Sequence, residues 1–284
     1  MRWPTLLFGC LALIILNGCS RVLFQPSRTL ITSPERLGLN YDDVYFRSAD
    51  GTMLHGWFIP ARTQPVKGTF VQFHGNAENI STHFRSLVWV VDHGYHLFTF
   101  DYRGYGRSEG TPALGGALDD VVAAIAQARA LPTREAGKPL VLYGQSLGGT
   151  LLLYAVGTMK DHSDITAVIA DSSFGSYQAI AREKLAGHWL TFAFQPLAYV
   201  LLSDRYAPES VLAGISPTPL LVIHGDRDEI VPSHHGQRIF DGARTPKWLW
   251  RLEGVGHIQA MAPRYGTHRQ ALLEFLGQLA SGAR

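Results

Sequence analysis

One serine of the sequence stands in a setting that suits nucleophilic chemistry. Residues 144–148 read Gly-Gln-Ser-Leu-Gly, and they join an apolar run at 139–143 to an apolar segment at 150–159. The run predicts a buried strand and the segment a helix, so Ser146 is expected on a tight strand-to-helix turn. Such a turn exposes the hydroxyl, and the start of the helix favours the negative charge that develops during attack on a carbonyl. We therefore predict Ser146 as a nucleophile; the plainer alternative is a glycine-rich helix start with an incidental serine.

A serine hydroxyl needs a general base and a group that orients this base. His257 follows the last expected strand, in a glycine-rich loop that can reach back over the sheet, and we predict it as the base. His268 is the alternative, but it falls at the expected start of a helix. The residue types leave three candidate acids, Asp226, Asp228 and Asp171, each at or just after the end of an apolar strand. Asp226 also suits the turn itself, because Asp side chains often bond their own backbone in turns.

The tetrahedral intermediate of acyl transfer requires two N–H donors for its oxyanion. Leu147, the residue after the nucleophile, offers one of them. The other is expected from the loop after the strand at 68–73, which reads His-Gly-Asn-Ala at 74–77. We predict the backbone N–H of Asn76 as this donor, with Ala77 as the second choice. The alternative interpretation of this loop is a glycine turn without a role in oxyanion binding.

Five motifs together resemble those of the α/β-hydrolase superfamily. They are the serine turn, His-Gly-Asn-Ala at 74–77, Asp-Tyr-Arg-Gly-Tyr-Gly at 101–106, His-Gly-Asp-Arg-Asp at 224–228 and Gly-His at 256–257. The nearest branch consists of small single-domain hydrolases that are grouped with serine aminopeptidases and lysophospholipase-like proteins, and the resemblance spans about residues 40–282. It implies Asp228 as the acid, since Ile-Val-Pro follows at 230–232 as in the superfamily. It also implies a hydrolase without a cofactor, and it leaves the substrate open.

Alternating strands and helices must position these residues. Apolar strands between helices indicate an α/β fold, with a mostly parallel, twisted sheet that helices cover on both faces. Two strands at 44–46 and 54–59, joined around Asp50-Gly51, predict an antiparallel hairpin at the N-terminal edge. The other strands are expected at 68–73, 96–100, 139–143, 165–170, 219–223 and 248–252, and helices at 81–92, 117–130, 150–159 and 269–279. The segment 101–106 is expected to shape a loop.

The alternation stops between Ser172 and Ser216, where apolar and aromatic residues show no obvious strand. We expect a small helical cap at about 173–215, inserted over the carboxyl ends of the strands, where ligands bind in sheets of this kind. Its aromatic residues either pack as core or lid, or form the wall of an acyl-binding site.

The N-terminus predicts a targeting segment. Arg2 precedes an apolar run at 6–16, which is short for a membrane-spanning helix and fits a signal peptide over residues 1–18. Leu-Asn-Gly-Cys at 16–19 resembles the lipobox of bacterial lipoproteins, which implies that Cys19 is lipidated and becomes the new N-terminus. Residues 19–40 would then tether a domain at 41–284 to the cell envelope, on the periplasmic side of the outer membrane if the host has two membranes. An uncleaved anchor and ordinary signal cleavage are the alternatives.

Composition narrows the classes of function. The formal net charge is only +2, and no dense stripe of Lys and Arg occurs, which argues against a nucleic-acid partner. The two cysteines are Cys10, inside the apolar run, and Cys19, so the mature domain would offer no thiol for a disulfide, a nucleophile or a metal. His234 and His235 are adjacent, but no matching carboxylate cluster accompanies them in the sequence. We therefore predict no metal ion.

These patterns predict a serine hydrolase that cleaves a carboxylic ester, or a related thioester or amide, through an acyl-enzyme on Ser146. A membrane-anchored chain with an apolar cap suits a small-molecule or lipid-like acyl substrate. Two alternatives stay open. One is a peptidase or acyltransferase that uses the same triad, and the other is a non-catalytic envelope protein that uses the fold for binding.

Overall fold

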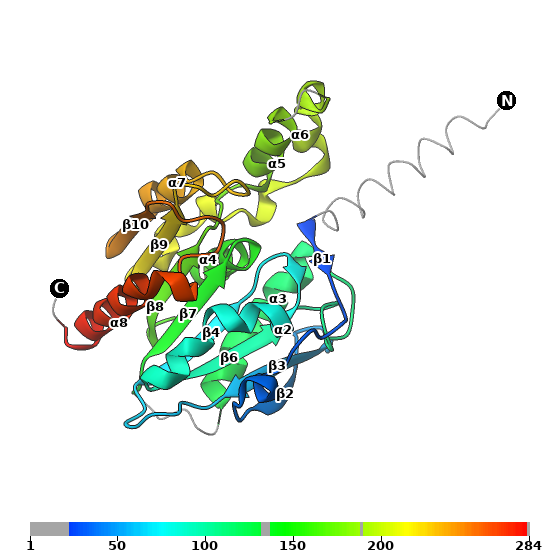
Figure 1. Cartoon of the computed structure of the whole chain (residues 1–284). Coiled ribbons are helices and arrows are strands. Elements are labelled where there is room, and N and C mark those ends of the chain that lie inside the picture. Colours follow the sequence, from blue (N-terminus) through cyan, green and yellow to red (C-terminus); the bar gives the residue numbers. More distant parts are fainter. Residues whose placement is uncertain (1–22, 132–136, 188–189, 283–284) are drawn as a thin grey trace.

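A sheet of eight strands runs through the molecule in the order β10-β9-β8-β7-β4-β6-β3-β2 (Figure 1). The computed structural model describes residues 23–131, 137–187 and 190–282. The strands of this sheet are β2 (Asp42–Arg47), β3 (Met53–Ile59), β4 (Gly68–Phe73), β6 (Tyr95–Asp101), β7 (Leu140–Gln145), β8 (Ile165–Asp171), β9 (Leu220–Gly225) and β10 (Lys247–Leu252). The pairs β2–β3 and β3–β6 are antiparallel, and all other neighbours are parallel.

The central strands are buried along their whole length because both faces of the sheet are covered. Every residue of β4, β6, β7 and β9 is buried, which explains their largely apolar sequences. The edge strand β2 differs, with Phe46 buried between exposed neighbours. Gly51, at a φ of +87°, turns the chain from β2 into β3. The predicted α/β fold, mostly parallel with an antiparallel edge hairpin, is confirmed.

Helices lie on both faces of the sheet (Figure 1). The helices α3 (Leu114–Ala130), α4 (Leu147–Thr158) and α7 (His234–Gly242) contribute to one core, while α2 (Ile80–His83) and α8 (Gly266–Ala280) contribute to the other. Adjacent residues of one strand point to opposite faces of the sheet, so their side chains lie in different cores. Leu142 of β7 packs in the first and Tyr143 in the second, as the two-residue period of a strand requires.

The single helix expected at 81–92 is instead a series of short turns. The helix α2 ends at His83, and the 3-10 turns η3 (Phe84–Ser86) and η4 (Val88–His93) follow. The sequence Val-Trp-Val-Val at 88–91 crowds β-branched and aromatic side chains, which lose rotamer freedom in an α-helix.

The strand order places the carboxyl ends of β4 and β7 side by side. From β4 the chain first proceeds to β6 on one side and later to β7 on the other, and ligand sites form at such switch points. The register pairs Phe73 with Gly144, so the loop after β4 and the turn after β7 begin together. In β9 and β10, Gly225 pairs with Leu252, which brings together the loops that carry Asp228 and His257.

The N-terminal segment joins the domain well before residue 41. Strand β1 (Gln25–Pro26) pairs in parallel with β5 (Ala77–Glu78), and the buried Phe24 packs against Tyr105 with ring centroids 6.4 Å apart. Residues 23–40, expected as part of a tether, therefore lie against the domain from Leu23 onward. The signal peptide predicted over 1–18 and the lipidation site predicted at Cys19 lie outside the described residues. Within those residues, we find no helix that has both the length and the apolar character to cross a bilayer.

The segment between β8 and β9 forms the helical insertion expected at 173–215. It contains α5 (Tyr177–Ala186) and α6 (Leu197–Leu201), together with the 3-10 turns η5 (Phe192–Phe194), η6 (Asp204–Tyr206), η7 (Pro208–Ser210) and η8 (Leu212–Ile215). Figure 1 shows α5 and α6 projecting as a small cap beyond the end of the sheet. The Asp204 carboxylate fixes the start of α5, since it accepts hydrogen bonds from Ser176 Oγ at 2.6 Å and from the Tyr177 N–H at 2.8 Å.

Candidate active site

Ser146 occupies a strained turn between β7 and α4. Its φ of +52° and ψ of −122° lie in a region that residues with a side chain rarely adopt, at a cost on the order of 1–3 kcal/mol. The Ser146 N–H donates to the Asp171 carbonyl at 2.8 Å, which ties the turn to β8. A side chain at Gly148 would collide with the backbone carbonyls of Phe73 and His74, so the close approach of α4 to β4 requires glycine there. The sequence therefore forms the strand–turn–helix arrangement expected around Ser146.

His257 and Asp228 are joined by a hydrogen bond of 2.8 Å between Nδ1 and Oδ2. When Asp228 is ionised, the Nδ1–H donates to it and Nε2 is left to accept a proton. The other carboxylate oxygen accepts the N–H groups of Ile230 at 2.9 Å and Val231 at 2.8 Å. Burial raises the pKa of Asp228, but the hydrogen bonds from His224, His257 and the backbone lower it by more, so that the pKa lies well below its usual range.

The backbone that follows His257 is also held in place. Ile258 has a φ of +49°, and its N–H donates to Ser172 Oγ at 3.0 Å. Ser172 itself has a φ of +54° and donates to the Asp171 carboxylate at 3.2 Å. Two strained residues in contact thus hold the histidine loop over β8. In this structure the side chains of Ser146 and His257 are not hydrogen-bonded to each other, and such catalytic contacts often tighten only in the presence of substrate.

The two other candidate acids bind different partners. Asp226 accepts the N–H of Gly254 at 2.7 Å, so it links its own turn to the start of the histidine loop. Asp171 accepts the hydroxyl of Tyr143 at 2.8 Å, and burial raises its pKa. Neither carboxylate bonds His257, and the acid that the structure brings to His257 is the one that the resemblance implied.

Asn76 and Leu147, the predicted oxyanion donors, line the same pocket as Ser146. Leu147 is the first residue of α4, so its N–H has no acceptor within the helix. The carbonyl oxygen of Asn76 accepts two hydrogen bonds, from Tyr105 Oη at 2.6 Å and from the N–H of Gln25 at 2.8 Å. Two donors on one carbonyl fix the orientation of the following peptide in the loop.

His83 holds the same loop from the other side. Its Nε2 lies 3.0 Å from the carbonyl oxygen of Ala77, the second-choice oxyanion donor. Burial lowers the pKa of His83 to about 4, with His74 and His257 acting in the same direction and the Ala77 carbonyl in the opposite one. The imidazole is therefore neutral near pH 7 and donates its Nε2–H to Ala77.

The alternative base, His268, faces elsewhere. Its Nδ1 lies 3.2 Å from the Ala260 carbonyl, and its ring stacks on Tyr265 with centroids 5.1 Å apart. These contacts hold it at the start of α8, where the sequence placed it, and leave His257 as the candidate base.

The segment 101–106 supports the loop at 74–77, which we call the oxyanion loop because it carries the predicted donors Asn76 and Ala77. Tyr102 donates its hydroxyl to the His74 carbonyl at 3.3 Å, and the buried Asp101 lies 3.5 Å from His74 Nε2. Arg103 anchors the segment through the buried carboxylate of Asp120 at 2.8 Å. The residues of this motif thus shape a loop, as expected.

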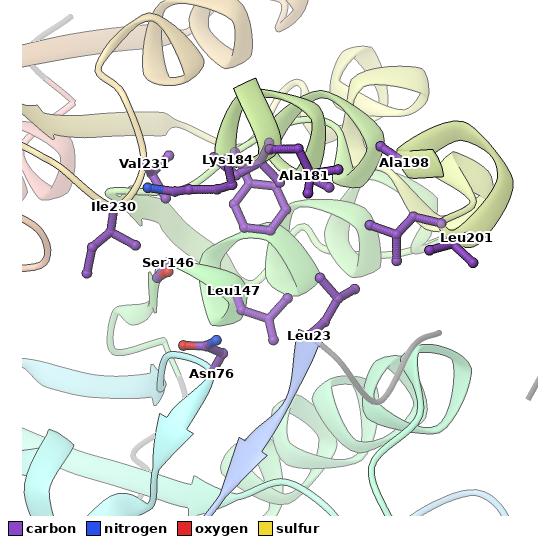
Figure 2. A pocket seen from close by; sticks show the side chains of 14 residues that line it. Leu23, Asn76, Ser146, Leu147, Ala181, Lys184, Ala198, Leu201, Ile230 and Val231 are labelled. Atoms are coloured by element: carbon purple, nitrogen blue, oxygen red, sulfur yellow. The ribbon is translucent and has the colours of Figure 1, made fainter. Parts of the chain in front are cut away.

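A pocket of about 390 Å³ extends from Ser146 under the cap (Figure 2). Figure 2 shows Ser146 and Asn76 towards one end, and Ala198 and Leu201 of α6 towards the other. Its lining is largely apolar and comprises Leu23, Asn76, Ser146, Leu147, Phe174, Ile180, Ala181, Lys184, Leu185, Ala198, Leu201, Leu202, Ile230 and Val231. Among these described residues Lys184 alone is charged, and its Nζ donates to the Glu229 carbonyl at 2.7 Å.

Sequence reasoning did not identify Leu23, Gln25 or His83 as parts of the site. Gln25 acts through its backbone N–H, which any residue except proline supplies, so its side chain carries no signal. Leu23 reaches the pocket only because β1 pairs with β5, and two-residue strands have no detectable period. His83 looked like an ordinary polar residue of a helix. Tyr105 stood within a quoted motif, but without an assigned role.

Comparisons with known proteins identify the family of this chain. The family model described as serine aminopeptidase S33 matches residues 64–212, more than half of the chain. YfhR of Escherichia coli K12 is 38% identical over 241 residues, which cover 83% of this chain and 80% of YfhR. The chain belongs to the serine aminopeptidase S33 family. WAV2 of Arabidopsis thaliana, an α/β-hydrolase domain-containing protein, is 30% identical over 230 residues, or 78% of this chain and 73% of WAV2.

The part that matches the S33 family model carries the oxyanion loop, Ser146 and most of the cap, while Asp228 and His257 follow it. Among solved structures, this S33-family member is similar to the esterase Pf2001 of Pyrococcus furiosus, with a TM-score of 0.71 over 91% of this chain and 98% of the esterase. The two sequences are 21% identical, so this likeness shows the fold, which is that of the α/β-hydrolases.

Proposed function

We propose that this S33-family member is a serine esterase, in which Ser146 attacks the carbonyl carbon of an ester that has an apolar acyl group. The observation that carries the proposal is the position of Ser146 on a strained turn at one end of an apolar pocket of about 390 Å³. The hydrogen bond of 2.8 Å between His257 and Asp228 supports the assignment of base and orienting acid.

In the acylation step, Ser146 Oγ forms a bond to the carbonyl carbon while His257 Nε2 accepts the hydroxyl proton. Asp228 holds the Nδ1–H and stabilises the imidazolium that results. The carbonyl electrons move onto the oxygen, and the N–H groups of Leu147 and Asn76 bind that oxyanion. Collapse of the intermediate breaks the C–O bond to the alcohol, which takes the proton from His257 as it leaves.

In the deacylation step, water replaces the alcohol. His257 removes a proton from the water, whose oxygen adds to the acyl carbon. The bond from this carbon to Ser146 Oγ then breaks, Oγ recovers the proton from His257, and the carboxylic acid departs. The low pKa of Asp228 keeps the carboxylate ionised through both steps, as the imidazolium requires.

The pocket lining favours an ester over the amide at the N-terminus of a peptide. An aminopeptidase must bind a free ammonium group next to the scissile bond. No Asp or Glu side chain occurs among the described residues that line the pocket, and Lys184 would repel an ammonium. An uncharged acyl chain fits the lining without any unpaired charge.

A substrate panel tests this function directly. Purified protein is assayed on p-nitrophenyl esters from acetate to palmitate and on aminoacyl p-nitroanilides, with Ser146→Ala as the matched control. We expect kcat/KM to rise from acetate to chains of intermediate length, and Ser146→Ala to lose at least about 10³-fold of the ester activity. Turnover of the anilides alone would contradict the esterase assignment and indicate a peptidase. Transfer of the acyl group to an added alcohol in preference to water would indicate an acyltransferase.

We also propose that the protein works at a membrane surface, with residues 1–18 removed and lipid attached to Cys19. Two observations support this placement. Leu23 lines the pocket, so the anchor would be only a few residues from the active site. The cap also exposes large apolar side chains, and residues 190–202 contain no charged residue. These side chains are 38–71% exposed and comprise Leu190, Phe192, Phe194, Leu197, Tyr199, Val200 and Leu201.

A lipid bilayer is the occupant that best fits this apolar surface. The helix α6 is apolar on all sides, with Ala198 and Leu201 towards the pocket and Tyr199 and Val200 towards solvent. A helix that is apolar all round is normally buried in protein or in lipid. Insertion of the cap tip into a membrane would cover the outer side and let an acyl chain enter the pocket without crossing water.

Two variants separate the anchor from the cap. Cys19→Ser should release the protein from membranes and abolish lipid labelling; unchanged retention would contradict the lipobox assignment. In the full chain, Phe192→Ser with Phe194→Ser should reduce the turnover of an ester embedded in vesicles and leave that of a short soluble ester unchanged. The matched control is Val122→Ser on α3, another exposed apolar residue. Equal effects of cap and control variants on the vesicle substrate would exclude membrane insertion of the cap.

A further inference from the structure

Three side chains able to bind a metal ion meet between the cap and the rest of the domain. Glu183 comes from the cap helix α5, while His234 and His235 are the first two residues of α7. Oε1 of Glu183 lies 3.1 Å from His234 Nε2, and Oε2 lies 3.1 Å from His235 Nε2. One ligand atom from each of the three residues lies within 4.8 Å of the other two.

The spacing of these atoms is close to that of a coordination shell. Metal–ligand bonds of about 2.0–2.1 Å place the corners of a tetrahedron about 3.3 Å apart. Both Glu183–His distances are near this value. The rings of His234 and His235 stand nearly parallel, with centroids 4.6 Å apart and planes 29° apart, so both Nε2 atoms reach the same carboxylate.

We propose that Glu183, His234 and His235 bind one divalent transition-metal ion of the zinc type, which clamps the cap helix α5 to α7. Two imidazoles and one carboxylate suit Zn²⁺ better than Mg²⁺ or Ca²⁺, which prefer shells of oxygen ligands. The His234 side chain is 54% exposed, so an ion can enter from solvent and water can fill the remaining positions. His235 is fully buried and Glu183 is 27% exposed, so these two side chains hold the inner part of the site in place.

The clamp would act on the wall of the pocket. Lys184 follows Glu183 directly, lines the pocket, and donates to the Glu229 carbonyl at 2.7 Å. Ile230 and Val231, which also line the pocket, precede the two histidines by only a few residues. A bound ion would therefore restrain both α5 and the loop that carries Asp228. Metal binding does not depend on the proposed esterase function. Any effect of the ion on ester turnover does rest on that function.

The adjacent histidines could not reveal this site from the sequence alone. The missing carboxylate is 51 residues from His234 along the chain, and the cap fold alone brings it there. Adjacent residues of a regular helix point 100° apart, but these two occupy its first turn and converge on a group above the helix end.

Zinc titration of the tag-free, chelator-treated full chain tests the proposal by calorimetry. We expect one ion per chain in the wild type. Glu183→Gln, which retains shape and hydrogen bonding, and His234→Ala should each weaken binding at least tenfold. His93→Ala, an exposed histidine outside the cluster, and His257→Ala should leave it unchanged. Co²⁺ should give visible d–d absorption in the wild type that Glu183→Gln lacks.

Hydrogen exchange supplies a readout that does not depend on activity. Zn²⁺ should slow exchange of the amides of α5 in the wild type and in Ser146→Ala, but not in Glu183→Gln. Equal zinc affinity of wild type and Glu183→Gln, or no binding to the wild type, would overturn the proposal and leave a hydrogen-bonded cluster only. Because Ser146→Ala retains the metal site, a failure of the esterase assignment is distinguishable from a failure of this one.

Discussion

The hydroxyl of Tyr105 donates a hydrogen bond of 2.6 Å to the carbonyl oxygen of Asn76. The same oxygen also accepts the N–H of Gln25, so a loop residue and the N-terminal strand converge on the peptide between Asn76 and Ala77, directly after the proposed oxyanion donor. Phe24 packs edge-on against the Tyr105 ring, which joins these two supports to each other. The position of Asn76 therefore depends on the segment that leads towards the proposed membrane anchor.

Removal of the Tyr105 hydroxyl should impair the reaction more than substrate binding. In Tyr105→Phe the Asn76 carbonyl loses one of its two hydrogen-bond donors, and the neighbouring Asn76 N–H, the proposed oxyanion donor, can move out of line. We expect kcat for a short ester to fall about 10- to 100-fold, with KM changed little. Steady-state kinetics measure both quantities. Tyr95→Phe, at the other end of the sheet, is the control, and a change in KM with normal kcat would show that Tyr105 acts on substrate binding instead.

Asp228 and Asp226 should differ sharply although they are two positions apart. Asp228→Asn removes the acceptor that orients the His257 Nδ1–H and stabilises the imidazolium, and kcat should drop about 10⁴-fold. Asp226→Asn removes only the acceptor of the Gly254 N–H and should retain most activity. The two variants are compared on one ester at one pH. Comparable losses in both would remove the reason for assigning Asp228 as the acid.

His83 should make the folded protein sensitive to mild acid. Its folded-state pKa of about 4 lies below the ordinary value of about 6.5, so the unfolded chain binds the proton more readily between these pH values. Stability therefore falls as the pH is lowered from 6.5 towards 4. Urea unfolding at several pH values should show a smaller decline in His83→Gln, whose amide can still donate to Ala77. Parallel declines for wild type and variant would mean that His83 keeps an ordinary pKa.

The Arg103–Asp120 pair should be far more important for stability than a surface pair. Asp120 is fully buried, and its removal would leave the buried Arg103 guanidinium without its main partner. Asp120→Ala should lower the free energy of unfolding by about 3–5 kcal/mol. Asp164→Ala removes a more exposed ion pair, the one with Arg129, and should lower the free energy of unfolding by only about 0–1 kcal/mol. Similar losses in both variants would contradict the assignment of a buried ion pair.

The parts of the fold and site that the sequence predicts correctly are those with a strong local pattern. The apolar strand before Ser146 is buried on both faces, so it reads as a continuous apolar run, and the glycines of the turn are required by contacts as close as that of Gly148 with β4. The proposed triad partners came from the loops after strands and, for Asp228, from a resemblance; the structure shows that these two side chains are hydrogen-bonded to each other. The hairpin turn and the helical cap were likewise visible as changes of pattern.

The parts that the sequence could not predict depend on contacts between distant segments. Glu183 reaches His234 only through the fold of the cap, and Gln25 reaches Asn76 through a backbone hydrogen bond that leaves no mark on the sequence. The short turns at 84–93 replaced an expected helix because β-branched residues crowd there. Tertiary packing determined the first two of these features, and local side-chain crowding determined the third.

Covalent labelling tests most directly whether Ser146 is an activated nucleophile. The folded protein is treated with a fluorophosphonate, digested, and analysed by mass spectrometry, with Ser146→Ala treated in parallel. We expect one adduct per chain, on the peptide that contains Ser146, and no adduct in Ser146→Ala. A folded wild-type protein that takes up no label, or a Ser146→Ala variant that is labelled to the same extent, would contradict this role of Ser146.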